Sequence, residues 1–274
     1  MEDSDVLGTT VSNMPELPEV ETIKNVLKEL TEGKTITSVD VLRPQTIDGD
    51  SQLFADSLKN QTIQSFERIG KFIIFHLTNE LVMVSHLRME GKYFLKNEKD
   101  TIQKHDLVVF HLNDGKKLVY NDTRKFGRMY IENQHIYRLY GPISKVGPDP
   151  FMMENASRLE KEFKNKSIAI KTALLDQTIM SGLGNIYADE VLFAVKVHPQ
   201  TPAKLVNRNK LEEILSAAKI ILRKACEAGG TTIKSYHPRE EINGNFQVDL
   251  KVYGKKNQAC PNCGTQLKKI FVNG

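Results

Sequence analysis

The stretch MPELPEVETIKNVLKEL, Met14–Leu30, marks the start of the fold. Pro18 suits the first turn of a helix, because its missing N–H would find no helical partner there. Apolar residues then recur at helical spacing as far as Gly33, namely Val20, Ile23, Val26, Leu27 and Leu30. This pattern predicts one amphipathic helix. The preceding residues 1–13, MEDSDVLGTTVSN, fit no signal or transit peptide, and we expect a disordered or mis-annotated extension there.

From Thr35 to about Glu132 the pattern changes to short β-branched and aromatic runs separated by turn residues. Such runs are typical of strands. Seven are expected: TITSVDVLR, TIQSFERIG, KFIIFHLT, LVMVSHLR, DLVVFHL, KKLVYND and RMYIEN. Seven strands at this spacing favour a sandwich or a barrel.

The chain changes character again at VGPDPF, residues 146–151, where two prolines and a glycine interrupt it. Helical patterns follow at 157–164, 167–176, 186–195 and 210–228. Phe246–Tyr253 then alternates like a strand of a hairpin. The sequence therefore predicts an α+β protein with an extension 1–13, a strand-rich domain 14–146, a helical domain 147–240 and a hairpin 241–274.

The composition is that of an ordinary globular protein of 274 residues, 40% hydrophobic and 26% charged. No apolar run approaches the ~20 residues of a membrane helix, so no membrane partner is expected. The formal charge of +4 permits an anionic partner but also fits many metabolic enzymes. Cys226, Cys260 and Cys263 are too few for a secreted disulfide framework, which favours a reducing cytoplasm.

The tail carries a C-x2-C knuckle at Cys260 and Cys263, followed by a glycine. Structural zinc is held by four ligands in a tetrahedron, so one knuckle is half a site. Two surface thiols in a lysine-rich hairpin are an equally good interpretation.

GLGN, residues 182–185, reads as a tight turn before a helix. Backbone N–H groups at a helix start, with Asn185 as a cap and Lys171 one helix earlier, would suit a phosphate. A purely structural turn is the more common use of such a glycine pair.

Other candidates are equally ambiguous on their own. DTRKFGRM places Arg124 and further basic residues around Phe126, which suits phosphate contact and base stacking, although an exposed cationic hairpin is the simpler explanation. His105 could contact a phosphate or a sugar, or form a structural pair with Asp106. Met89 would by default lie in the core.

Taken together, these motifs identify a protein family far more specifically than any one of them does alone. MPELPEVET, HLRMEGK, DTRKFG, LLDQTIMSGLGNIYADEVLF, and VYGKK followed by CPNCG occur in this order and closely resemble the formamidopyrimidine-DNA glycosylases. The resemblance runs from Met14 to Gly274. It implies an N-terminal β-sandwich flanked by helices, then a helix-two-turns-helix domain with a zinc-finger hairpin, and a lesion bound in the groove between the domains.

The resemblance assigns the chemistry to four residues. Pro15 would be the nucleophile, once it is the first residue of the chain. An α-amino group has a pKa of roughly 8, so part of it is uncharged near neutral pH. Glu16 would handle protons, Glu19 would support the site, and Lys71 would act in β elimination and contact phosphates near the lesion.

The resemblance also implies how DNA is held. A flipped base leaves a void, which Met89, Arg124 and Phe126 would fill, with Arg124 bonding the orphaned cytosine. The phosphate contacts implied are His105, Lys171 and Asn185.

The opening PELPEVE resembles the branch that acts on oxidised purines, which favours 8-oxoguanine and formamidopyrimidines in double-stranded DNA, followed by β,δ elimination. An endonuclease VIII-like enzyme for oxidised pyrimidines and a non-catalytic DNA-binding derivative remain alternatives. We expect a cytoplasmic monomer.

Two features depart from the family pattern. The Pro15 nitrogen is an amide while residues 1–14 are attached, so we expect translation to start at Met14 or, as a second route, proteolytic maturation. The chain stops at VNG, residues 272–274, before a second cysteine pair and a DNA-contacting arginine. We therefore expect a truncated gene model or fragment, with zinc bound weakly by Cys260 and Cys263.

Overall fold

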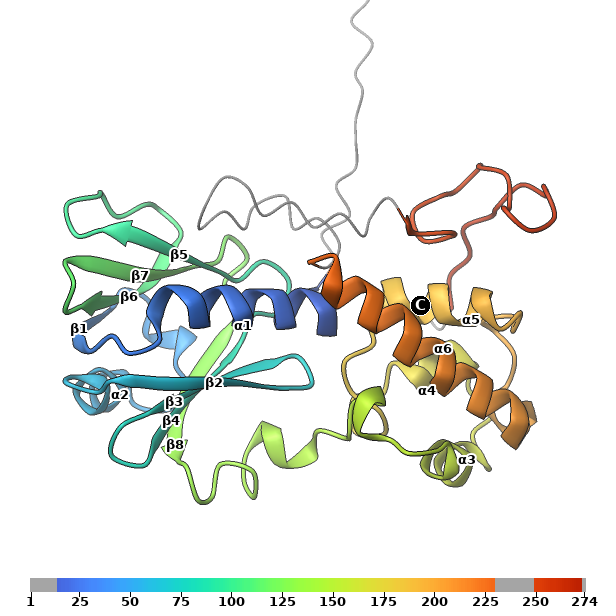
Figure 1. Ribbon diagram of the computed structural model, residues 1–274, viewed down its shortest axis with the longest axis horizontal. Helices are drawn as coiled ribbons and strands as arrows, with labels where there is room; N and C mark the ends of the chain where they lie inside the picture. Colours follow the sequence, from blue (N-terminus) through green and yellow to red (C-terminus); the bar gives the residue numbers. More distant parts are fainter. Residues whose placement is uncertain (1–13, 230–248, 273–274) are drawn as a thin grey trace, which may run out of the picture.

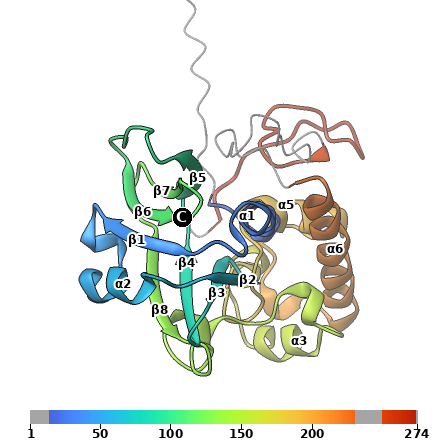
Figure 2. The same cartoon turned by 60° about the vertical axis from the view of Figure 1, so that its left-hand side comes forward.

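The computed structural model describes residues 14–229 and 249–272, which form two lobes side by side (Figure 1). The first lobe is a β-sandwich and the second is helical. Helix α1 (Leu17–Thr31) runs along the sandwich and packs against α6 (Arg208–Glu227) of the second lobe. Figure 2 looks along α1, which lies between the strands and helices α5 and α6. No helix in the described part of the chain is long and apolar enough to span a membrane.

Within the described residues, the sandwich consists of two four-stranded sheets in which every neighbouring pair is antiparallel. The first sheet has the order β1 (Ile36–Val41), β6 (Asp106–Leu112), β7 (Lys116–Asn121) and β5 (Lys92–Asn97). The second has the order β2 (Ile63–Ile69), β3 (Phe72–Leu77), β4 (Leu81–His86) and β8 (Arg128–Asn133). The predicted α+β fold class is thus confirmed.

The strand register gathers particular chain segments at one end of the sandwich, which we call the inner end. Four strands finish there, β1, β2, β4 and β7, and the other four begin there. The turns at the inner end therefore include 70–71, 87–91 and 122–127. Gly70 adopts φ +57 and approaches the side chains of Val146 and Ser181, so this end faces the helical lobe.

The sandwich core lies between the sheets and under α1 and α2 (Ser51–Leu58). Its aromatic centre is a chain of ring contacts, from Phe75 to Tyr93 at 5.8 Å and from Tyr93 to Tyr120 at 5.2 Å between centroids. All three rings are buried. Asp50 caps the start of α2, because its carboxylate accepts hydrogen bonds from the N–H groups of Gln52 and Leu53.

The helical lobe packs its helices around a separate apolar core to which Leu17, at the start of α1, also belongs. Its other α-helices are α3 (Ser157–Phe163), α4 (Ile170–Leu174) and α5 (Asn185–Ala194). Short 3-10 helices lie at η1 (Pro44–Thr46), η2 (Pro142–Lys145), η3 (Pro150–Met152) and η4 (Ala203–Leu205).

All seven strands predicted between Thr35 and Glu132 and all five predicted helices are present. Strand β5 and helix α2 were not predicted. Helix α4 is shorter than the predicted 167–176, because Ala169 instead forms an antiparallel bridge with Pro202.

The predicted strand Phe246–Tyr253 is wrong in its described part, because residues 249–253 are irregular, with a bend at 251–252, and form no strand. The N–H groups of Lys251, Val252 and Tyr253 donate to the Glu190 carboxylate of α5 at 2.8–2.9 Å instead of to a strand. Residues 246–248 lie outside the described part. The extension 1–13 and residues 230–240 of the predicted helical domain lie outside it as well.

Candidate active site between the two lobes

Glu16 joins the two lobes just before α1 begins. Its carboxylate accepts hydrogen bonds from the main-chain N–H groups of Gly184 and Ile186, both at 2.7 Å, and of Tyr187 at 3.2 Å. These donors form the start of α5, where unpaired N–H groups and the helix dipole favour a negative charge. The side chain of Glu16 is buried, so the contact is shielded from water.

The glycines of GLGN make room for this contact. A Cβ on Gly184 would lie 2.5 Å from Cδ of Glu16, and one on Gly182 would lie 2.6 Å from Cδ1 of Leu17. Gly182 also adopts φ +99, a conformation that favours glycine. Its carbonyl accepts a hydrogen bond of 2.9 Å from the N–H of Leu17. The turn is therefore shaped to receive the start of α1.

This finding corrects one sequence-based interpretation. GLGN was expected to offer open N–H groups to a phosphate, with Asn185 as the cap. In the structure Glu16 accepts from three main-chain N–H groups at the start of α5, the N-cap residue is Gly184, and Asn185 is the exposed first residue of the helix. Asn185 remains available on the surface, whereas the helix start itself is already occupied.

Glu19 completes the contact from the first turn of α1. Its carboxylate accepts from the main-chain N–H of Glu16 at 3.0 Å and from the hydroxyl of Tyr187 at 2.7 Å. Burial, together with the charge and hydrogen bond of Glu19, raises the pKa of Tyr187, so the tyrosine stays a donor. Glu16 and Glu19 thus both accept hydrogen bonds from residues at the start of α5, and together they hold α1 and α5 against each other.

Lys71 lies beside this carboxylate pair, at the turn between β2 and β3, and only 6% of it is exposed. Burial lowers the pKa of Lys71, and the charges of Glu16 and Glu19 partly oppose that effect. Burial likewise raises the pKa of Glu16 to about 7, although Lys71 acts in the other direction. Near neutral pH the Glu16 carboxyl group can therefore exist in either protonation state, and burial makes the Lys71 ammonium easier to deprotonate than that of an exposed lysine.

Pro15 directly precedes Glu16 and is buried. It is therefore adjacent in the chain to the buried Glu16 carboxyl group, whose charged neighbours are Lys71 and Glu19. In the chain as it stands, the nitrogen of Pro15 forms an amide with Met14, which leaves no amine at this position.

His86 also belongs to this end of the sandwich, and the sequence did not single it out. Its Nδ1 accepts a hydrogen bond of 3.0 Å from the N–H of Arg88. Burial and the charges of Arg88 and Lys71 lower the pKa of His86 to about 3, so the imidazole is neutral. A neutral ring beside Lys71 adds no positive charge to the buried site.

The loop 122–127 carries two predicted DNA-binding residues and is organised by Asp122. The buried carboxylate of Asp122 accepts from the N–H groups of Arg124 and Gly127, both at 2.9 Å. This arrangement turns Arg124 and Phe126 outward. Phe126 is 50% exposed, and the guanidinium of Arg124 lies over its ring at 5.0 Å from the centroid. An apolar ring held at the surface in this way is suited to contact a partner.

The hydroxyl of Tyr120 keeps this loop next to the turn that carries Met89. A Cβ on Gly91 would lie 2.3 Å from that hydroxyl, and one on Gly127 would lie 1.6 Å from it. Both glycines are therefore in van der Waals contact with the same buried tyrosine. Met89 is half-buried in its turn and lies outside the apolar core, which corrects the default interpretation.

His105 lies at the same end, just before β6. Its carbonyl accepts a hydrogen bond of 3.0 Å from the N–H of Asp122, and its buried Nδ1 has no hydrogen-bond partner among the described residues. Asp106 pairs with Lys96 and Asn121 rather than with His105, so the expected structural pair is wrong.

Lys171 lies apart from these residues, on α4. Its ammonium forms an ion pair of 2.7 Å with Asp189 of α5. A phosphate would have to compete with that carboxylate, so Lys171 is less accessible than the sequence indicated. The structure thus brings Pro15, Glu16, Glu19 and Lys71 together, gathers Met89, His105, Arg124 and Phe126 at the inner end, and leaves Lys171 and Asn185 on the helical lobe.

The C-x2-C knuckle forms a short turn in the tail. Ala259 and Gln266 form an isolated antiparallel bridge, and the N–H of Cys260 donates to the carbonyl of Thr265 at 2.8 Å. Hydrogen bonds with Thr265 lower the pKa of the Cys263 thiol. No group of three or more His, Cys, Asp or Glu side chains in the described residues could hold a metal, so these residues do not form a complete zinc site.

Comparison with known proteins agrees with this two-lobed arrangement. Residues 14–129 match the family model of the formamidopyrimidine-DNA glycosylase N-terminal domain, and residues 146–237 match that of the formamidopyrimidine-DNA glycosylase H2TH domain. A formamidopyrimidine-DNA glycosylase of Ligilactobacillus salivarius is 43% identical over 263 residues, which cover 94% of each protein.

Two solved structures of Lactococcus lactis Fpg are similar over nearly the whole chain. One, a mutant in complex with a Fapy-dG containing DNA, is 34% identical with a TM-score of 0.89 and covers 95% of this chain and 96% of its own. The other, the wild-type protein in complex with an oxidised pyrimidine containing DNA, has the same identity and coverage and a TM-score of 0.87. The chain therefore belongs to the formamidopyrimidine-DNA glycosylase family, whose members are DNA glycosylases of base excision repair.

Proposed function

We propose that this protein removes oxidised purines from double-stranded DNA and then cleaves the abasic strand, with the amine of Pro15 as the nucleophile. The observation that carries the proposal is the buried group formed by Glu16, Glu19 and Lys71 next to Pro15. Two carboxylates and an amine enclosed between two lobes are what proton transfer around a nucleophilic amine requires.

The first chemical step forms a bond between the Pro15 nitrogen and C1′ of the damaged nucleoside. The bond from C1′ to the base breaks, and its electron pair leaves with the base, which takes up a proton. Opening of the sugar ring and loss of the amine proton give an iminium. Glu16 supports these transfers, because a pKa of about 7 lets one carboxyl group both donate and accept a proton near neutral pH.

The iminium is an electron sink that acidifies the hydrogens on C2′. Loss of one of them expels the 3′ phosphate, and a second elimination expels the 5′ phosphate, which leaves a one-nucleotide gap. Burial lowers the pKa of Lys71, so its ammonium loses a proton more readily than that of an exposed lysine, and the neutral amine can accept such a proton. Lys71 is therefore our candidate for the β-elimination base.

The damaged base must leave the stack before C1′ can be reached, which costs a few kcal/mol. Met89, Arg124 and Phe126 are our candidates for filling the resulting space. The half-exposed ring of Phe126 suits a wedge between base steps, and the guanidinium of Arg124 suits a base edge.

Borohydride trapping tests the nucleophile, because it reduces an iminium to a stable amine. The chain is expressed from Met14 so that removal of the methionine exposes Pro15, and it is mixed with a duplex containing 8-oxoguanine opposite cytosine. We expect a covalent adduct that maps to Pro15. The matched control is the chain that keeps residues 1–14, in which the same nitrogen is an amide and should give no adduct. A folded, DNA-bound protein that gives no adduct from either chain would contradict the catalytic proposal.

The choice of lesion needs a direct comparison, because Lactococcus lactis Fpg has been solved both with Fapy-dG DNA and with an oxidised pyrimidine. We propose oxidised purines as the preferred class, since PELPEVE resembles that branch. Single-turnover excision from otherwise identical duplexes containing 8-oxoguanine, Fapy-dG or an oxidised pyrimidine tests this. Faster excision of the pyrimidine would favour the endonuclease VIII-like alternative.

We propose that Cys260 and Cys263 supply two thiolates to a zinc ion whose other ligands lie outside the described residues. The support is the knuckle turn and the lowered pKa of Cys263, which favours the thiolate that zinc needs. Zinc titration of the chain and of Cys263→Ser tests it. Equal zinc content in both proteins would contradict the proposal.

A further inference from the structure

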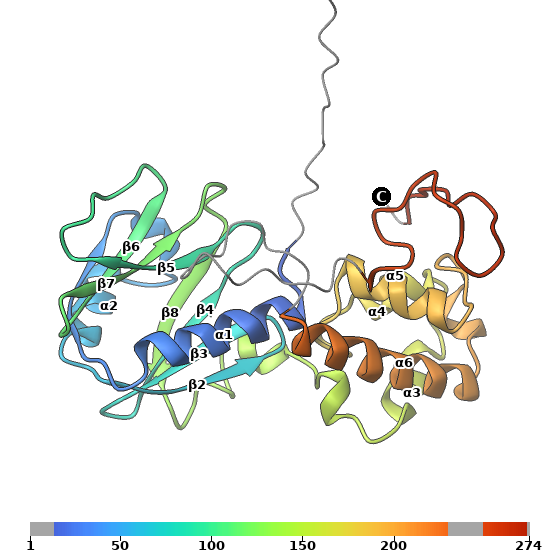
Figure 3. The same ribbon diagram turned by 45° about the horizontal axis from the view of Figure 1, so that its top comes forward.

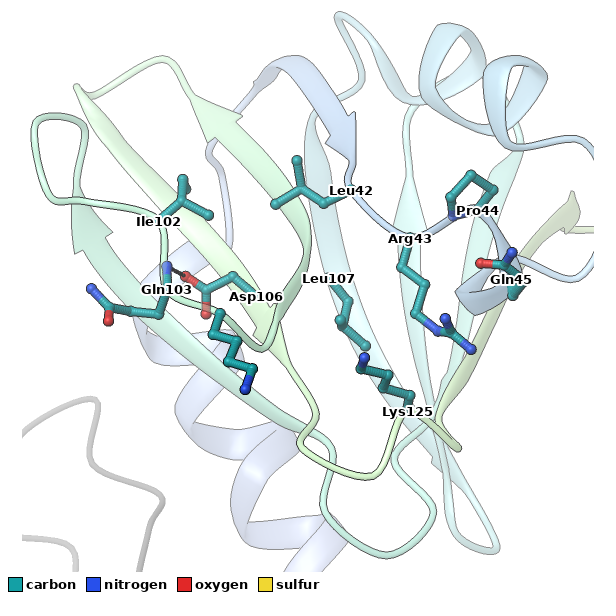
Figure 4. A pocket seen from close by; sticks show the side chains of 10 residues that line it. Leu42, Arg43, Pro44, Gln45, Ile102, Gln103, Asp106, Leu107 and Lys125 are labelled. Atoms are coloured by element: carbon teal, nitrogen blue, oxygen red, sulfur yellow. Dashed lines mark hydrogen bonds between the residues drawn. The ribbon is translucent and has the colours of Figure 1, made fainter.

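A pocket of about 390 Å³ lies at the inner end of the sandwich, next to the loop that carries Arg124 and Phe126. It is lined by residues 42–45 after β1, by residues 102–104 before β6, by Asp106 and Leu107 at the start of β6, and by Lys125. In Figure 4 the side chains of Arg43, Leu107 and Lys125 gather at one side of it. None of these lining residues has a role in the chemistry proposed above.

The pocket is strongly cationic. Arg43, Lys104 and Lys125 line it, and none of the three forms an ion pair or a side-chain hydrogen bond with a residue that the structure describes. Asp106 is its one acidic lining residue, and that carboxylate is already held by Lys96 at 2.9 Å and Asn121 at 2.8 Å. The described residues that line the pocket therefore leave its positive charge without a counter-charge.

Arg43 provides the strongest evidence that an anion binds in this pocket. Its Nε is buried and has no hydrogen-bond partner among the described residues. A buried donor without an acceptor is costly, so native structures rarely leave one unsatisfied. Backbone contacts hold Arg43 in place, because its N–H and that of Leu42 both donate to the carbonyl of Leu107. A guanidinium carried by this anchored stretch of backbone suits the paired oxygens of a phosphate.

The rim and the position of the pocket indicate what kind of phosphate compound it binds. Leu42 is 50% exposed and Ile102 is 46% exposed, so apolar surface flanks the cationic centre. A deoxyribose-phosphate backbone offers the same combination, with apolar sugar faces between anionic groups. Lys125 connects the pocket to the loop between β7 and β8, since it stands between Arg124 and Phe126 and adopts φ +60. A duplex that contacts Arg124 and Phe126 would pass close to this pocket.

We propose that this pocket binds a backbone phosphate of the duplex outside the lesion base pair, with Arg43 as the main ligand. The proposal rests on the proposed function in that it takes double-stranded DNA as the ligand. A contact of this kind is independent of sequence and of damage, and it adds one released counterion to the binding equilibrium.

Duplex binding by the full chain, measured by fluorescence anisotropy over a range of salt concentrations, tests the proposal. We expect Arg43→Gln to weaken binding of damaged and undamaged duplexes by the same factor, about tenfold, and to reduce the slope of log Kd against log salt by about 0.9. Lys104→Gln should act in the same direction. The matched control is Lys59→Gln, which removes the same charge from an exposed site after α2 and should change neither quantity. Thermal melting checks that each variant is folded.

One further measurement distinguishes a duplex site from a site for small anions. The ¹⁵N resonance of Arg43 Nε should shift on addition of equimolar duplex; a shift with millimolar inorganic phosphate but not with duplex would show a small-anion site and overturn the proposal. Arg43→Gln and Lys104→Gln binding duplex as tightly as Lys59→Gln would also overturn it, provided that the unaltered protein binds. If the unaltered protein neither binds the duplex nor is trapped by borohydride, the proposed function is wrong as well.

Discussion

The carboxylate of Glu16 accepts a hydrogen bond of 2.7 Å from the main-chain N–H of Gly184, a residue 168 positions further along the chain. A side chain from the sandwich lobe thereby caps a helix of the other lobe. The same carboxyl group lies beside Pro15 and Lys71, so the position of the proposed nucleophile and the docking of the lobes depend on one residue.

Replacement of Glu16 by glutamine should therefore affect both catalysis and stability. Glu16→Gln keeps one acceptor oxygen but points an NH₂ group at main-chain donors, so we expect about 1–3 kcal/mol of lost stability. Loss of the proton-handling group should slow base excision by about 10² or more. Urea unfolding and single-turnover excision measure the two effects. Glu213→Gln, on the exposed face of α6, is the control and should change neither.

The pKa of Glu16 also predicts how stability depends on pH. Its folded value of about 7 lies above the ordinary value of 4.5, so the folded state binds the proton more tightly than the unfolded state. The resulting contribution is fully present below about pH 4.5 and is lost as the pH rises to about 7. We expect the stability difference between the unaltered protein and Glu16→Gln to shrink over this window, by up to about 3 kcal/mol. A constant difference from pH 4.5 to 7 would show that burial does not raise this pKa.

The strands could be predicted from the sequence, because short runs of β-branched and aromatic residues bounded by turn residues, as in KFIIFHLT, are typical of strands. Strand β5 was missed. Its sequence KYFLKN begins and nearly ends in lysines, and only Tyr93 is fully buried. Helix α2 was missed because its eight residues carry too few apolar positions for a clear period.

The site could be predicted only in part. The family motifs indicated Pro15, Glu16, Glu19 and Lys71, but no local pattern shows that Glu16 caps α5, since the partners are distant in sequence. The ion pair between Lys171 and Asp189 escaped notice for the same reason. Asp122 and Tyr120, which position the loop of Phe126, act through buried hydrogen bonds and close glycine contacts that composition does not reveal.

Gly184→Ala tests how closely the lobes must approach. The backbone at Gly184 has φ −132, which any residue can adopt, so the cost of alanine there comes from the clash with Glu16 alone. We expect a loss of about 2 kcal/mol or more and slower excision, because relief of the clash must move Glu16. Gly115→Ala is the contrasting variant, with φ +75 and no atom within 4 Å of the added Cβ. It should lose about 1 kcal/mol and keep normal excision.

Phe126→Ala should separate DNA recognition from folding. The ring is 50% exposed, so its removal should leave the free energy of unfolding within about 0.5 kcal/mol of the original. Binding of a lesion duplex should nevertheless weaken, because the proposed wedge is lost. Asp122→Ala removes the acceptor for the N–H groups of Arg124 and Gly127, and it should weaken both folding and binding. Unchanged lesion binding by Phe126→Ala would exclude the wedge.

The last prediction concerns Glu190, which holds the tail against α5. Its carboxylate accepts from the N–H groups of Lys251, Val252 and Tyr253, and it is buried, so the three amides should exchange slowly with solvent deuterium. Glu190→Gln replaces one acceptor oxygen with a donor and should accelerate exchange at these amides, while the amides of β3 and β4 keep their protection. The tail would then be less well fixed beside the helical lobe, and duplex binding should weaken if the tail contacts DNA. Unaltered exchange at residues 251–253 would show that the tail is anchored by other contacts.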